Sequence, residues 1–219
     1  MLGPLSRRQM LAGSAAIVGL TGCSRAPSPG SEPQVSILKS TYGNELFDNV
    51  RRLIAEHKLK VRGKRILLKP NLVEFDPGTA INTSPLLVLA ALEAFRALGA
   101  AQVKIAEGPG HRRCTLDLAE AAGYFRIVPG FEELFTDLNL DEVARVPLPR
   151  AAGGLKSLYL PRTALACDLL VSIPKMKTHH WVGATLGMKN LFGLVPGAVY
   201  GWPKNVLHWA GIDESIVAL

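Results

Sequence analysis

The stretch RILLKPNLVEFDPGTAINTSPLLVLAALEAFRALGAAQVKIAE, residues 65–107, decides the fold of this chain. Its two ends, 65–69 and 102–107, are short β-rich runs, and between them Thr83-Ser84-Pro85 opens a helix that stops at Gly99. A capping residue before proline, and glycine after the last turn, are the usual boundaries of a helix. A strand, a helix and a second strand in this order predict parallel strands joined by a crossover helix.

The same alternation continues on both sides of this unit. Before it, residues 35–39 have the pattern of a strand and residues 44–58 that of a helix with one apolar face. After it we expect helices over 115–122 and 131–138 and strands over 158–160 and 169–173. The last strand is a continuous apolar run, typical of a strand buried on both faces. The sequence therefore predicts an α/β fold: a mostly parallel sheet with helices on both faces, in a Rossmann-like three-layer arrangement.

The first 22 residues have the pattern of an export signal. Paired arginines, Arg7-Arg8, precede an apolar run that is too short to cross a bilayer, which needs about 20 apolar residues. This combination is typical of twin-arginine signals. The run ends in Leu20-Thr21-Gly22-Cys23, which resembles the lipobox of bacterial lipoproteins, where the cysteine sulfur receives the lipid. The alternatives are a buried N-terminal helix and an uncleaved anchor.

Three segments follow from this interpretation: a signal over 1–22, a Pro/Ser/Gly tether over 23–33, and an α/β domain over 34–219. Because a predicted helix from about Asp213 runs into Leu219, we expect the domain to continue beyond this sequence. We expect the protein on the periplasmic side of the membrane, lipid-anchored through Cys23, after passage through the twin-arginine translocase. That route carries folded proteins and so favours a cofactor, whose identity the sequence leaves open.

Composition narrows the functional class. The 219 residues are 48% hydrophobic and 20% charged, with a net charge of +7, as in a globular domain. Basic residues are scattered among acids and aromatic residues make up 6%, so the basic stripe with stacking rings that a nucleic-acid surface needs is missing. We expect no nucleic-acid partner and favour a small anionic ligand. Cys114 and Cys167 either pair or stay free thiols.

Polar and basic side chains follow three of the predicted strands. Lys69-Pro70-Asn71 follows the first, the turn 108–113 (GPGHRR) the second, and residues 174–180 (PKMKTHH) the last. Because carboxyl ends of parallel strands share one edge of a sheet, we expect these groups to converge. The glycine-rich turn and its arginines suit an anion, unless this is an ordinary strand-to-helix turn. Lys175 and Lys177 would share one face of an extended backbone, unless they lie in a solvated loop.

A glycine-rich stretch, 183–197, contains Lys189-Asn190 at its centre. Glycines at this density allow close approach of the backbone to a ligand. The apolar neighbours Met188, Leu191 and Phe192 would remove water from Lys189 and lower its pKa, which makes a lysine reactive. The alternative is a helix broken by glycines with an exposed lysine.

We do not predict a metal site. Potential ligands are present at His111, His179, His180, His208, Cys114, Asp76 and Glu107. However, no two histidines have the spacing of a helical metal-binding pair, and adjacent histidines rarely reach the same ion.

Four segments resemble the signatures of domain-of-unknown-function family 362. They are residues 67–72 (LLKPNL), Glu107-Gly108, 172–179 (SIPKMKTH) and 187–193 (GMKNLFG). The resemblance extends from about residue 66 to residue 209. It implies no established activity and therefore assigns no catalytic residue.

A shorter stretch is similar to the nickel-pincer lactate racemase family. Gly110-His111-Arg112 and Lys189 match that family in order and context. This resemblance implies that the turn and the lysine would serve a pyridinium-derived nickel cofactor.

We therefore expect a membrane-tethered enzyme of redox or isomerase type that acts on a small anionic metabolite with a cofactor. His111 or His179 would move protons, and Lys189 would anchor the substrate or cofactor. The expected ligand-binding residues are Lys69, Asn71, Gly108, Gly110, Arg112, Lys175, Lys177 and Asn190. The alternatives are a non-catalytic solute-binding lipoprotein that uses the same cleft and a structural lipoprotein.

Overall fold

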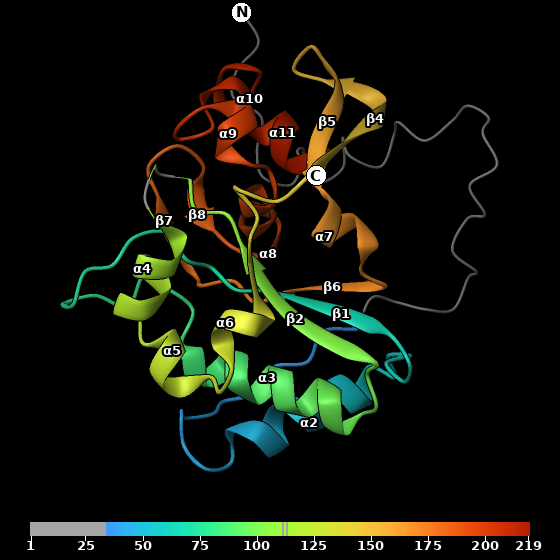
Figure 1. The fold of residues 1–219 in the computed structure, drawn as a ribbon, viewed down its shortest axis with the longest axis vertical. Helices are drawn as coiled ribbons and strands as arrows, with labels where there is room; N and C mark the ends of the chain where they lie inside the picture. Colours follow the sequence, from blue (N-terminus) through green and yellow to red (C-terminus); the bar gives the residue numbers. More distant parts are fainter. Residues whose placement is uncertain (1–33, 111, 113) are drawn as a thin grey trace, which may run out of the picture. The chain divides into compact units, whose positions relative to one another are not determined.

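Four parallel strands form the central sheet. They are β1 (Arg65–Lys69), β2 (Gln102–Glu107), β3 (Phe135–Asp137) and β6 (Leu169–Ser172), in the order β3-β2-β1-β6. The predicted bounds of β1 and β2 are correct at both ends. The sheet and the helices around it confirm the predicted α/β fold with a Rossmann-like layout (Figure 1).

The computed structural model describes residues 34–110, 112 and 114–219. The predicted signal and tether, Cys23 included, lie outside the described residues, and so do His111 and Arg113 in the turn after β2. Residues 37–219 form one compact unit, to which all the elements below belong.

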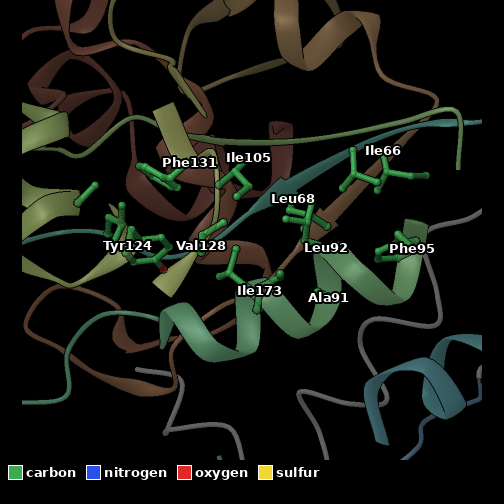
Figure 2. Close-up of a cluster of buried hydrophobic side chains, with 14 of the residues drawn as sticks. Ile66, Leu68, Ala91, Leu92, Phe95, Ile105, Tyr124, Val128, Phe131 and Ile173 are labelled. Carbon is green, nitrogen blue, oxygen red and sulfur yellow. The ribbon is translucent and has the colours of Figure 1, made fainter. Parts of the chain in front are cut away.

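One face of the sheet packs against α3 (Pro85–Ala97), with α2 (Leu46–Glu56) beside that helix. Figure 2 shows Ile66 and Leu68 of β1 pointing toward Leu92 of α3, in the largest cluster of buried apolar side chains. Side chains alternate along a strand, so residues 66 and 68 share this face and Leu67 points to the other.

The opposite face is covered by the C-terminal part of the chain. Leu67 of β1 packs there with Leu194 of the 3-10 helix η1 (Leu191–Leu194) and with Ala164 of α7 (Arg162–Ala166). Both α7 and the neighbouring α8 (Gly187–Asn190) lie across the sheet from α3 (Figure 1). Helices on both faces therefore confirm the predicted layers.

The segment between β2 and β6 differs from the sequence prediction. After α4 (Thr115–Ala121) and α5 (Tyr124–Ile127), the predicted helix over 131–138 is only the short α6 (Phe131–Leu134), and β3 follows at once. Phe135 pairs with Ile105 of β2 in parallel register. Residues 135–137 thus form a strand because the edge of β2 offers them hydrogen-bond partners. A prediction from local helix preference does not take such partners into account.

A second, antiparallel pair of strands was mostly missed by the sequence prediction. β4 (Val143–Ala152) and β5 (Leu155–Pro161) form a hairpin, of which only residues 158–160 were expected. Its two turn residues, Gly153 and Gly154, have φ of 54° and 84°, as a two-residue type I′ turn requires. The hairpin packs on α11 (Ile212–Ala218).

The remaining elements surround the carboxyl end of the sheet. They are the hairpin of β7 (Lys177–His179) and β8 (Gly183–Thr185), then α9 (Gly197–Tyr200) and α10 (Asn205–Trp209). A small apolar cluster that includes Leu158, Phe192 and Leu207 joins this region to the β4–β5 hairpin.

Two smaller predictions were wrong. Residues 35–39 form no strand and pair with none of the strands that the structure describes, and Ile37 is 94% exposed. β6 lies at the edge of the sheet with all four residues half-buried, not buried on both faces. No helix in the described part of the chain is both long and apolar enough to cross a membrane.

Candidate functional site

A cavity of about 230 Å³ lies at the carboxyl ends of β1 and β2. The β7–β8 hairpin and the α8, η1 and α10 segments form its other walls. Four lysines line it: Lys69, Lys177, Lys189 and Lys204. β1 has β2 on one side and β6 on the other, so the order of strands reverses here, which is where ligands bind in open α/β sheets.

Lys69 and Glu107 form a buried ion pair in the floor of this cavity. The Lys69 Nζ atom donates to both carboxylate oxygens, at 2.8 and 2.7 Å, and both side chains are almost fully buried. The backbone N–H groups of Leu72 and Gly108 donate to the same carboxylate, at 3.2 and 2.8 Å. Burial lowers the pKa of Lys69, and Glu107 opposes that shift. The negative charge of Glu107 is thus fully engaged.

Asn190 holds α8 against the sheet at this point. Its Nδ2 atom donates to the Lys69 carbonyl at 3.1 Å and to the Ser172 hydroxyl at 3.0 Å, and so joins α8 to β1 and β6. Three residues further along the chain, Gly193 lies directly on the ion pair, because a Cβ atom there would come within 2.5 Å of Lys69 Nζ. This one glycine of the glycine-rich stretch is therefore needed for close approach to the ion pair.

Lys204 is a buried cation that the sequence prediction missed. Only 1% of this residue is exposed, and its Nζ atom donates to the carbonyls of Gly108 (2.7 Å) and Phe192 (2.9 Å). Burial lowers the pKa of Lys204 to about 7. Residues 204 and 108 are far apart in the sequence, and no local pattern indicates that they meet.

Lys177 and Lys189 also line the cavity. Lys177 Nζ donates to the Ile81 carbonyl at 2.8 Å, and burial lowers the pKa of this lysine. Lys189 Nζ lies 4.4 Å from the centre of the Phe192 ring. Burial, and then the charges of Lys69 and Lys177, lower the pKa of Lys189 to about 8, as its apolar neighbours predicted.

The cavity therefore has an excess of positive charge. Among the described residues that line it, Glu107 is the only carboxylate, and it is paired with Lys69. Lys177, Lys189 and Lys204 form no ion pair with any described carboxylate. Three ammonium groups around one small space create an attractive field for an anion.

Two neutral imidazole rings also line the cavity. His179 Nδ1 accepts a hydrogen bond from the Trp181 backbone N–H at 3.2 Å, and burial lowers the pKa of His179 to about 4. His208 Nδ1 lies 3.1 Å from the Lys204 carbonyl, and burial and Lys189 lower the pKa of His208. These contacts place the proton on Nε2 of His179 and on Nδ1 of His208. His179 can therefore donate a hydrogen bond from Nε2, and His208 can accept a proton on Nε2.

Aromatic contacts hold these rings in place. The ring of His180 stacks on that of His179 at 4.9 Å, and Trp181 meets His208 edge-on at 4.2 Å. Trp181 remains 53% exposed, so this wall borders the solvent.

The cavity gathers most of the residues that the sequence predicted for a site. Eight of them line it: Lys69, Asn71, Gly108, Gly110, Lys177, His179, Lys189 and Asn190. Lys175 is half-buried and Arg112 exposed, and neither is among the lining residues. Lys175 still lies near enough for its charge to contribute, after burial, to the lowered pKa of Lys177. His111 lies outside the described residues.

The polar groups here suit an anionic group better than a metal ion. In the described ranges, no three His, Cys, Asp or Glu side chains lie close enough together to hold a metal. Glu107, one of the possible ligands, is engaged by Lys69. The charged part of a cofactor would have to be held by Lys177, Lys189 and Lys204. Cys114 and Cys167 are both free thiols.

Comparisons with known proteins place these segments in a family. A curated thylakoid-associated protein of Synechocystis sp. is 29% identical over 141 residues, 64% of this chain and 42% of that protein. This chain thus spans about two fifths of the length of that relative. No solved structure matches this chain. The similarity to nickel-pincer racemases stays a prediction. The family model "Domain of unknown function (DUF362)" matches residues 66–219, and this chain therefore belongs to the DUF362 family.

Proposed function

We propose that the lysine-lined cavity binds a small anionic metabolite and that the protein is an enzyme acting on it. One observation supports this most strongly. Lys177, Lys189 and Lys204 face one cavity whose single described carboxylate is already neutralised by Lys69. Burying unpaired positive charge is costly, and a bound anion would offset that cost.

The size of the cavity limits the ligand. At about 230 Å³ it is smaller than sites for drug-sized ligands, which measure about 300–1,000 Å³. A metabolite with a carboxylate or phosphate and a few carbon atoms fits this space. Because water screens charges less in a partly buried site, each ammonium group attracts the anion more strongly than at the surface.

The cavity also contains groups suited to proton transfer. His208 has Nε2 free to accept a proton, and the pKa of Lys189 is lowered to about 8, while His179 can donate a hydrogen bond from Nε2. Acid–base groups work best when their pKa lies near the working pH. These features support an enzyme of isomerase or redox type, with any cofactor still to be identified.

Anion binding can be tested by thermal unfolding. We expect lactate, pyruvate or phosphate to raise the midpoint of unfolding, while glycerol, a neutral compound of similar size, leaves it unchanged. Lys177→Ala and Lys189→Ala should abolish most of the shift. Lys64→Ala is the matched control, because Lys64 is exposed and precedes the opposite end of β1. The proposal is wrong if no small anion stabilises the wild-type protein.

A second measurement separates an enzyme from a solute-binding protein. Protein purified after co-expression with its export system would be analysed for metal, chromophore or covalent lysine adduct, and for conversion of the bound anion. Conversion that Lys189→Ala removes would support the enzyme. Binding without any conversion or bound group would favour a non-catalytic solute-binding lipoprotein.

We also propose that the protein is exported and anchored by a lipid on Cys23. The lipobox-like segment 20–23 and the paired arginines before it support this proposal. The relative in Synechocystis is named as thylakoid-associated, which agrees with a location at a membrane. In a bacterial host that is fed a labelled fatty acid, we expect label on the wild-type protein and none on Cys23→Ala. If neither the wild-type protein nor Cys23→Ala carries label, the lipid anchor is rejected.

A further inference from the structure

We propose that Lys189 forms an imine with its ligand and that the ligand is a 2-oxo acid, a carboxylate with a carbonyl group beside it. This inference rests on the proposed function and names its substrate class. It requires one lysine in the cavity with a free amine, and further cations that hold the carboxylate.

The hydrogen bonds distinguish Lys189 from the other three lysines. Lys69 is paired with Glu107, Lys177 donates to the Ile81 carbonyl, and Lys204 donates to two carbonyls. Each of those interactions stabilises a protonated ammonium group. Lys189 Nζ donates to no acceptor in the described part of the chain and lies over the face of the Phe192 ring.

The surroundings of Lys189 also favour its neutral form. Burial and the neighbouring cations Lys69 and Lys177 lower its pKa to about 8. At pH 7, about one molecule in ten then has a free amine, against fewer than about one in a thousand for an ordinary lysine. The neutral amine is the nucleophile in imine formation.

The remaining cations and rings have complementary roles. Lys177 and Lys204 lie in the same cavity and supply positive charge for the carboxylate. The proton on Nδ1 of His208, held by the Lys204 carbonyl, leaves Nε2 free to accept a proton. His179, protonated on Nε2, can donate a hydrogen bond to the carbonyl oxygen of the ligand.

The reaction balances without an oxidant or reductant. The neutral amine of Lys189 attacks the carbonyl carbon, a C–N bond forms, and the π electron pair of the carbonyl moves to oxygen, which takes a proton from solvent. His208 accepts the proton that nitrogen loses and passes it to the new hydroxyl group. The C–O bond then breaks and water leaves, so that a protonated imine remains and one proton in total is taken up from solvent. That cation withdraws electrons from the adjacent carbon, whose proton becomes removable, as isomerase chemistry needs.

Trapping with cyanoborohydride tests the inference. The full chain is incubated with glyoxylate, pyruvate or oxaloacetate and the reductant, and its lysines are located by peptide mass spectrometry. We expect one adduct on Lys189, with at least about tenfold more label than on any exposed lysine. Lys189→Arg, which keeps the charge but cannot form an imine, should lose the adduct and still be stabilised by lactate. Lys175→Arg, outside the cavity lining, should keep it.

The possible failures are distinguishable. If lactate stabilises the protein but none of the three 2-oxo acids labels Lys189 selectively, the imine is rejected and the anion site remains. Label spread evenly over exposed lysines also rejects it. If neither lactate nor any 2-oxo acid stabilises the protein, the proposed function itself is wrong.

Discussion

Lys69 and Glu107 determine how the other charges of the cavity behave. Glu107 accepts hydrogen bonds from Lys69 and from two backbone N–H groups, so it does not neutralise the remaining lysines. Both residues were visible in the sequence, but their pairing was not. It depends on the parallel register that sets β1 beside β2.

Removing the negative charge from this pair should destabilise the fold. Glu107→Gln leaves the buried Lys69 ammonium unpaired, which we expect to lower the free energy of unfolding by about 3–5 kcal/mol. Urea denaturation measures the change. The double variant Lys69→Met/Glu107→Gln removes the unpaired charge and keeps an oxygen acceptor for the backbone, so it should regain part of the loss. A Glu107→Gln variant as stable as the wild type would contradict the role of the pair.

Anion affinity should depend on pH through Lys204 and Lys189. Their pKa values are lowered to about 7 and about 8, and an anion binds best when both are protonated. Affinity for lactate is therefore expected to be highest below about pH 7 and to fall toward about pH 9, with proton uptake on binding in between. Calorimetry in two buffers of different ionisation enthalpy measures this uptake. Affinity that is constant or rises over this range would exclude the two lysines as ligands.

The sequence predicted the chemical state of Lys189 but not that of Lys204. The lowered pKa of Lys189 was expected from its apolar neighbours in the sequence, one of which, Phe192, lies against its ammonium group. The burial of Lys204 could not be predicted from its neighbours in the sequence, because only the tertiary structure brings the carbonyls of Gly108 and Phe192 to its ammonium group. Local chemistry can be predicted from neighbours in the chain, and long-range hydrogen bonds cannot.

At the scale of elements, local signals decided which predictions succeeded. β1 and β2 are short apolar runs bounded by proline and glycine, and α3 has proline in its first turn; their positions were predicted almost to the residue. The prediction for β3 failed because its three residues become a strand only through pairing with β2. The β4–β5 hairpin was missed although Gly153-Gly154 is a recognised turn signal.

The approach of η1 to the ion pair makes a clear element-scale prediction. In Gly193→Ala the new methyl group would overlap Glu107 and Lys69, so η1 must move away from β1. We expect a loss of about 1–3 kcal/mol in the free energy of unfolding and weaker anion binding. Gly187→Ala, with no atom within 4 Å of its Cβ position, is the control and should be tolerated. Equal stability of the two variants would contradict this packing.

At the scale of the whole molecule, topology explains why the site forms where it does. β1 lies between β2 and β6, so polar groups after all three strands reach one edge of the sheet. The predicted convergence therefore followed from fold class, and eight of the predicted site residues line one cavity. The net charge of +7 does not identify a site, because what matters is that three lysines line one cavity and form no ion pair with a carboxylate of the described residues.

The central claim is that Lys177, Lys189 and Lys204 bind one small anion together. Isothermal titration of lactate into the wild type and into Lys177→Ala, Lys189→Ala and the double variant tests it most directly. We predict one anion per chain, and a loss of about tenfold or more in affinity for each single variant, since a hydrogen bond to a charged group contributes about 1.5–3 kcal/mol. Equal affinity of the wild type and the double variant, or no saturable binding at all, would contradict it.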